Sequence, residues 1–132
     1  MPDTDLIYLL ARILSCGIWI AAALYKATHY ELTIHEMREQ RIPWSRVILT
    51  PVIVLELAGA LLLIIDWWVW AVALAWLIFL VPASWIYHGR YMVRRGTIDF
   101  PQWISFWKNV SIAGGLLALI LLDASRPAWL FA

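Results

Sequence analysis

Four long apolar stretches, separated by short or polar segments, dominate the chain. The stretches cover residues 6–28, 47–65, 67–87 and 106–122. A helix needs about 20 mostly apolar residues to cross a bilayer. None of the stretches alternates as a transmembrane strand would, and backbone groups in lipid must be satisfied within their own element. The pattern therefore predicts an all-α membrane protein, a four-transmembrane-helix bundle in a single domain over residues 1–132.

The segments between the stretches predict how the bundle is connected. The link between the second and third stretches is about Asp66 alone, which predicts a tight antiparallel hairpin. The other two links, 29–46 and 88–105, are longer and polar, and the first is expected to hold a short surface helix that ends before Pro43. Six arginines occupy these two links: Arg38, Arg41, Arg46, Arg90, Arg94 and Arg95. Because positive charge gathers in cytoplasmic loops, both links are expected in the cytoplasm and both termini outside.

Composition supports a protein that resides in the lipid bilayer. Apolar residues make up 64% of the chain, against roughly 45–50% in soluble domains. The net charge of +1 gives no reason to expect nucleic-acid binding. The single cysteine, Cys16, excludes an internal disulfide. The start of the chain is acidic and its first apolar stretch is long, so we expect a retained span and not a signal peptide.

Charged and polar residues inside the apolar stretches are the candidates for chemistry. Glu56 is the only charge of its stretch, and a rise of about 1.5 Å per residue places it roughly 13 Å deep. An ionised group at that depth is costly, so it needs protein, water or a partner beside it. By the same estimate Lys26 and Lys108 lie about 3 Å inside the same end, with Asn109 and His88 near their level. Together these five residues predict an intramembrane ligand-binding cluster.

Each of these residues also has a purely structural interpretation. Either lysine can extend its ammonium group to the membrane interface. His88 alone is typical of a loop histidine. Glu56 can form a structural ion pair with Arg12 or a lysine, or stay protonated because it is buried.

A second charged level is predicted at the opposite end of the bundle. Arg12 lies about 24 Å from the end that holds Lys26, and Asp123 has nearly that depth, with Asp66 slightly beyond. Arg12 could pair with either aspartate, so Arg12 and Asp123 are predicted to be structural buried charges.

Known catalytic and metal-binding patterns are absent from the sequence. The three histidines do not share a helical face with carboxylates, so no metal site is predicted. There is no C-x-x-C pair, phosphate loop or nucleophile elbow. We therefore expect no intrinsic cofactor and no self-contained catalytic site.

Three segments resemble the DoxX family of small membrane proteins. They are "LLARILSCGIWIAAALYK", "TPVIVLELAGALLLI" and "FWKNVSIAGGLLAL". The first segment has an early arginine and a final lysine. The second has a proline, followed by a glutamate and a glycine that share one helix face. The third has a Lys-Asn pair that precedes a Gly-Gly pair. The usual glycine of the first segment is replaced by Ala22-Ala23-Leu24, and the third apolar stretch is unusually rich in tryptophan. The resemblance implies a four-helix inner-membrane protein, and some members resemble a subunit of a thiosulfate:quinone oxidoreductase.

The leading hypothesis is a membrane subunit of a redox-linked complex that binds a quinone or a lipid headgroup at the polar cluster. Its expected partners are the lipid bilayer and other protein subunits, with a homo-oligomer as a further arrangement. One alternative is a structural accessory subunit with no small-molecule site. Another is a small transporter or proton path that uses Glu56 as a relay. No inverted repeat is visible, which argues against the transporter.

Overall fold

The computed structural model describes residues 2–126, with side chains from residue 5 onward, and it is largely helical. Four of its helices are long and apolar enough to cross a membrane, which confirms the predicted class of fold. These candidate spans are Asp5–Thr28, Ser45–Ile64, Val69–Tyr91 and Phe100–Ala124. The chain divides into two compact units, an N-terminal unit up to Trp68 and a C-terminal unit from Val69.

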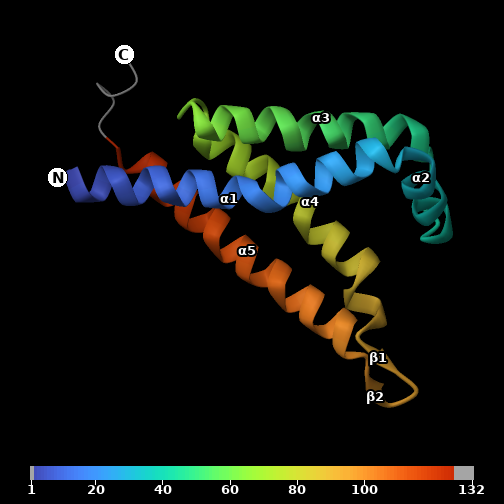
Figure 1. The fold of residues 1–132 in the computed structure, drawn as a ribbon. Coiled ribbons are helices and arrows are strands. Elements are labelled where there is room, and N and C mark those ends of the chain that lie inside the picture. The colour runs from blue at the N-terminus through green and yellow to red at the C-terminus, as the bar shows by residue number, and fades with distance from the viewer. Residues whose placement is uncertain (1, 127–132) are drawn as a thin grey trace. The chain divides into compact units, whose positions relative to one another are not determined.

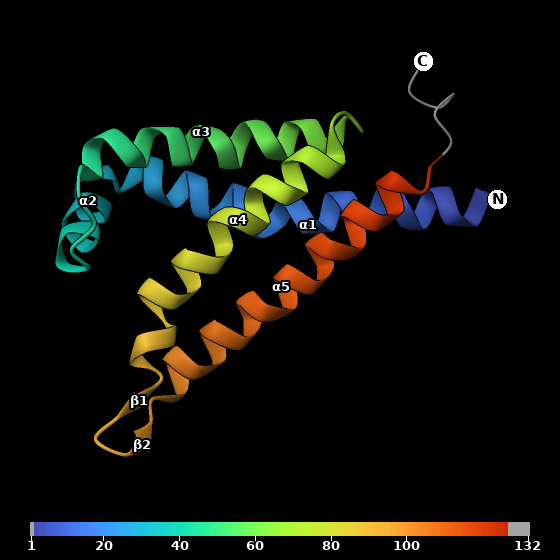
Figure 2. The same ribbon diagram turned by 180° about the vertical axis from the view of Figure 1, so that it is seen from behind.

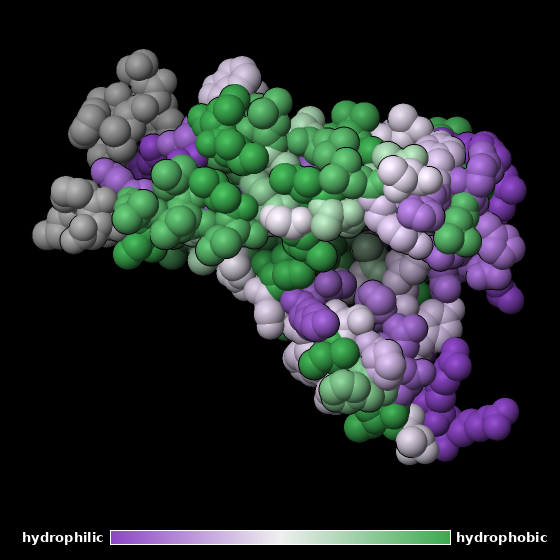
Figure 3. All heavy atoms as spheres, in the orientation of Figure 1, coloured by the Kyte–Doolittle hydropathy of each residue, from purple (hydrophilic) through white to green (hydrophobic). Residues whose placement is uncertain are grey.

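The N-terminal unit is a pair of long helices with a short helix at one end. Helices α1 (Pro2–Thr28) and α3 (Ser45–Ile64) lie side by side and run in opposite directions (Figures 1 and 2). Helix α2 (Tyr30–Glu39) connects them and confirms the predicted surface helix. Hydrophilic residues gather over α2, whereas apolar residues predominate over the middle of α1 and α3 (Figure 3). The polar end and the apolar sides are what a membrane-spanning helix pair requires.

Contacts between α2 and the start of α3 hold this end together. The guanidinium group of Arg46 donates two hydrogen bonds to the Glu31 carboxylate, at 2.7 and 2.6 Å. These bonds hold the pKa of Glu31 below its ordinary value. The Tyr30 hydroxyl lies 3.0 Å from the Thr50 hydroxyl. These polar side-chain contacts therefore dock α2 on the first turns of α3.

The C-terminal unit is a second antiparallel helix pair. Helices α4 (Val69–Tyr87) and α5 (Phe100–Ala124) are joined by the 3₁₀ helix η1 (Gly89–Tyr91) and a two-stranded hairpin. Strands β1 (Val93–Arg94) and β2 (Thr97–Ile98) pair with Val93 opposite Ile98 and Arg94 opposite Thr97. The two residues between the strands, Arg95 and Gly96, both have positive φ, of 49° and 77°. A two-residue turn with positive φ at both positions matches the twist of a β-hairpin.

Two of the differences between the helix ends and the apolar boundaries change how the helices are connected. Helix α5 begins at Phe100, six residues before the predicted 106, because the Asp99 side chain accepts a hydrogen bond from the Gln102 amide and Pro101 lies in the first turn. The predicted link of Asp66 alone was too short, since α3 ends at Ile64 and α4 begins at Val69. Asp66 and Trp68 in this link have positive φ, of 62° and 56°.

The glycines of the helices and of η1 have very different surroundings. A Cβ added at Gly89 would lie 2.5 Å from the Trp85 ring and 3.2 Å from Phe106, so η1 packs closely on α4 and α5. At Gly17, Gly114 and Gly115 no described atom lies within 4 Å of an added Cβ. These three glycines therefore make no close helix contact within their own unit.

Candidate ligand site in the membrane span

Glu56 lies on α3 and meets Lys26 from the last turn of α1. The Lys26 Nζ donates a hydrogen bond to Glu56 Oε1 at 2.5 Å. The Glu56 side chain is only 1% exposed and that of Lys26 is 23% exposed. The structure thus brings together two of the five predicted ligand-binding residues, as a buried carboxylate and a partly exposed ammonium group.

The two side chains meet although their backbone positions differ in depth by about 10 Å. Side chains on a helix lean toward its N-terminus. Because α1 and α3 are antiparallel, Lys26 leans toward the middle of the pair and Glu56 leans toward the end that carries α2. The two lean toward each other, which closes a gap that helix rise alone leaves open.

The second oxygen of the Glu56 carboxylate does not take part in the contact with Lys26. Glu56 Oε2 is buried and has no hydrogen-bond partner within the part of the chain that the structure describes. A buried carboxylate oxygen without a donor loses the hydrogen bonds it had in water. The site therefore offers an acceptor to any water or ligand that brings an O–H or N–H group.

Arg12 binds the C-terminal end of α3. Its Nη1 donates to the Leu63 carbonyl at 2.8 Å and to the Ile64 carbonyl at 3.3 Å, and it lies 3.6 Å from Asp66 Oδ1. The last carbonyls of a helix lack partners within it and carry partial negative charge. Arg12 is buried, and of its two predicted partners the structure pairs it with Asp66, together with these carbonyls.

Asp123 has the corresponding role at the N-terminal end of α4. Its Oδ2 accepts a hydrogen bond from the Trp70 amide at 2.9 Å, and its Oδ1 lies 3.5 Å from the Arg126 guanidinium. Like Arg12 it is buried. Each of the two predicted structural charges thus binds a helix terminus.

The other three candidates belong to the C-terminal unit. His88 Nδ1 lies 2.6 Å from Gln102 Oε1, a local contact that favours its interpretation as a loop histidine. Lys108 is exposed and Asn109 is half-buried on α5. Among the described residues neither side chain has a hydrogen-bond or ion-pair partner, so both remain candidates from the sequence. No group of His, Cys, Asp or Glu side chains in residues 5–126 could hold a metal ion.

The fold and the site define a small protein with four candidate membrane spans and an ion pair between a buried glutamate and a partly exposed lysine. Residues 7–89 match the family model of DoxX, so the chain belongs to the DoxX family. The matched region contains Arg12, Lys26, Glu56 and His88 and ends before Lys108. The chain is also 28% identical over 113 residues to the inner membrane protein YphA of Escherichia coli K12, covering 86% of this chain and 80% of that protein. No solved structure matches the chain.

Proposed function

We propose that this protein is a multi-pass inner-membrane subunit of a redox-linked complex and binds a quinone or a lipid headgroup beside Lys26 and Glu56. One observation carries the ligand site. The Glu56 carboxylate is buried and bonded to Lys26 through one oxygen, while its second oxygen has no partner in residues 5–126. A closed structural ion pair in a low-dielectric site would be expected to satisfy both oxygens.

The chemistry of the pair suits a ligand with an oxygen that changes between acceptor and donor. The Lys26 ammonium group can donate to a quinone carbonyl or a phosphate oxygen. Glu56 Oε2 can accept from a hydroxyl group, as in a reduced quinone, and can take up its proton. Partner proteins would supply the electron carrier and any catalytic centre.

Location and assembly rest on relatives. The named relative is an inner membrane protein, and four candidate spans are consistent with that location here. The redox-linked assembly rests on the family resemblance of the charged helices.

The accessory subunit without a ligand is the competing function. The direct contact of 2.5 Å between Lys26 and Glu56 favours it, because a pair this close leaves little room for a ligand between the two groups. The first function predicts that purified protein carries a bound quinone or lipid, and the second predicts that it carries no specific ligand.

Organic extraction followed by mass spectrometry separates them. We expect wild-type protein to carry a quinone, or one lipid class enriched over the bulk membrane, in about equimolar amount. Lys26→Gln is expected to lose that ligand and to remain helical by circular dichroism. Lys108→Gln and Asn109→Ala, measured alongside, report whether α5 contributes to the same site. If wild-type protein carries no quinone and only bulk lipid, the ligand site proposed beside Lys26 and Glu56 is wrong.

A further inference from the structure

The hairpin between α4 and α5 has two chemically different faces. Cross-strand partners lie on the same face of a hairpin, and successive residues alternate between faces. Val93 and Ile98 are partners, so one face is apolar, and these side chains are 59% and 55% exposed. Arg94 and Thr97 are partners on the other face. Transfer of these two exposed side chains from water into an apolar environment is favourable.

Positive charge gathers on the other face of the hairpin and at its tip. The guanidinium carbons of Arg90 and Arg94 lie 5.3 and 6.0 Å from the centre of the same Tyr91 ring, and Arg95 occupies the tip. Asp99 is the only carboxylate between residues 88 and 105, and it lies 4.0 Å from Arg94 Nε. On the hairpin itself Arg94 and Arg95 carry two positive charges against the one carboxylate of Asp99, and this excess of positive charge attracts an anion.

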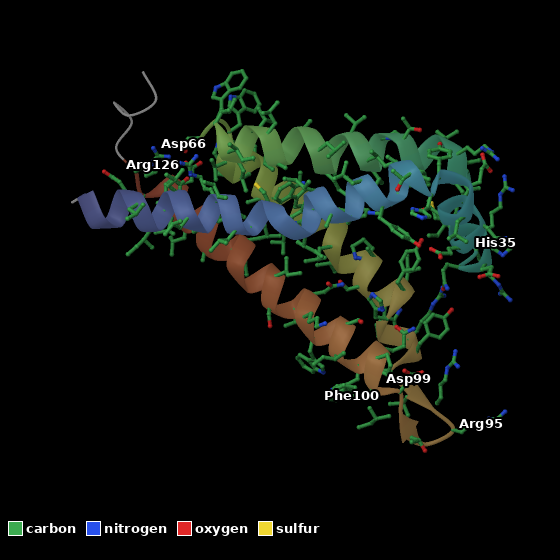
Figure 4. All side chains as sticks on the ribbon, viewed as in Figure 1. His35, Asp66, Arg95, Asp99, Phe100 and Arg126 are labelled. Carbon is green, nitrogen blue, oxygen red and sulfur yellow. The ribbon has the colours of Figure 1, made fainter. Side chains whose placement is uncertain are left out.

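Surrounding aromatic residues indicate the level at which the hairpin lies. It joins the candidate spans Val69–Tyr91 and Phe100–Ala124 directly, so it cannot lie far from the membrane surface. Phe100 is 66% exposed beside it, and Figure 4 shows Phe100 and Arg95 at the same end of the unit. Trp85 and Trp107 are also exposed near this end. Exposed aromatic side chains of membrane helices prefer the headgroup region.

We propose that the hairpin docks on anionic phospholipid. Val93, Ile98 and Phe100 enter the interface between headgroups and acyl chains. Arg95 at the tip and Arg94 on the other face extend their long side chains to the headgroup level, where their guanidinium groups bind the lipid phosphate. An arginine presents several N–H donors in a fixed plane, which suits a phosphate group. This site uses neither Lys26 nor Glu56 and does not depend on the function proposed for them.

The test uses the full chain in nanodiscs of either dioleoyl phosphatidylglycerol, which is anionic, or dioleoyl phosphatidylcholine, which is not. Hydrogen–deuterium exchange is followed over residues 92–99. We expect slower exchange in the anionic nanodiscs, and loss of that difference in the double variant Arg94→Gln, Arg95→Gln. The matched control, Arg38→Gln with Arg41→Gln in the other polar link, should keep it.

Affinity gives a second measurement in detergent. Titration with short-chain phosphatidylglycerol should give binding about fivefold weaker for each arginine removed from the hairpin. Val93→Ser with Ile98→Ser should also weaken binding although no charge changes. Equal exchange in the two nanodiscs would overturn the proposal. So would a control variant that loses as much as the hairpin variant, or inorganic phosphate alone slowing exchange as much as the lipid.

Discussion

Lys26 and Glu56 differ in the free-energy cost of losing the partner side chain. Lys26 is 23% exposed and its ammonium can extend toward the interface, whereas Glu56 is 1% exposed and cannot leave the interior. We therefore expect Lys26→Met to lower the free energy of unfolding by about 3 kcal/mol, because it leaves a buried carboxylate unpaired. Glu56→Gln should lower it by about 1 kcal/mol. Reversible unfolding in detergent measures both.

The double variant Lys26→Met, Glu56→Gln is the control for this asymmetry. Because no charge then remains in the interior, its stability should return close to that of Glu56→Gln alone. Equal losses in the two single variants would contradict the unequal burial on which the prediction rests.

Arg12 contributes through contacts that other basic residues cannot copy. Its guanidinium group reaches two carbonyls and a carboxylate at the end of α3. We expect Arg12→Leu to lower the free energy of unfolding by about 2–3 kcal/mol, the range for lost hydrogen bonds to a charged group. Arg12→Lys should recover only part of the loss, because an ammonium group lacks the planar fork. The same unfolding assay applies, and a wild-type midpoint for Arg12→Leu would remove the role assigned to it.

At the scale of elements, the turn from α4 into η1 depends on the absence of a side chain at Gly89. A methyl group there meets the Trp85 ring at 2.5 Å. We expect Gly89→Ala to lower stability by about 1–3 kcal/mol through overpacking. Gly17→Ala is the matched control, because nothing lies within 4 Å of its added Cβ and alanine favours a helix. Thermal unfolding should show a lower midpoint for Gly89→Ala only.

The docking of α2 on α3 is expected to weaken in acid. Hydrogen bonds from Arg46 lower the pKa of Glu31, so the folded state binds its proton less readily than the unfolded state. The stabilisation is therefore complete above the ordinary glutamate pKa of about 4.3, and it is lost as the pH falls through the lower folded value.

A spin label at Glu36→Cys on α2 would report this loosening. We expect its mobility to rise as the pH is lowered below about 4. In the Glu31→Gln background mobility should be high at every pH. A label that is equally immobile in that background would show that Tyr30 and Thr50 suffice to hold α2.

For the whole molecule, the arginine-rich links predict the direction in which the chain crosses the membrane. Cysteine at Arg38→Cys or Arg94→Cys should resist a membrane-impermeant thiol reagent in intact cells, and Thr4→Cys should react. Native Cys16 is buried at 1% exposure, so the background should be low. The reverse labelling pattern would invert the predicted orientation and leave the four candidate spans unchanged.

The long helices were predictable because apolar length is a property of the sequence itself. The start of α5 was missed because apolar length alone set its boundary, although Asp99 and Pro101 carry a local capping signal. Backbone depth alone separates Lys26 from Glu56 by about 10 Å. It underestimates how closely the two charged groups approach, because side chains tilt toward the N-terminus of their helix. Arg12 was placed at the correct level, but main-chain carbonyls are the same at every residue, so no sequence pattern marks those of Leu63 and Ile64 as its partners.

The pairing of Lys26 with Glu56 also bears on how the protein enters the membrane during synthesis. The ribosome makes α1 before α3, so Lys26 is already present when the carboxylate of Glu56 emerges. An isolated helix with a charge near its middle partitions poorly from the translocon into lipid. We expect α1 to stay beside the translocon until α3 arrives, so that the two helices leave it as one neutralised hairpin. The order in which α1 and α3 are synthesised therefore helps the buried carboxylate of Glu56 to enter the membrane.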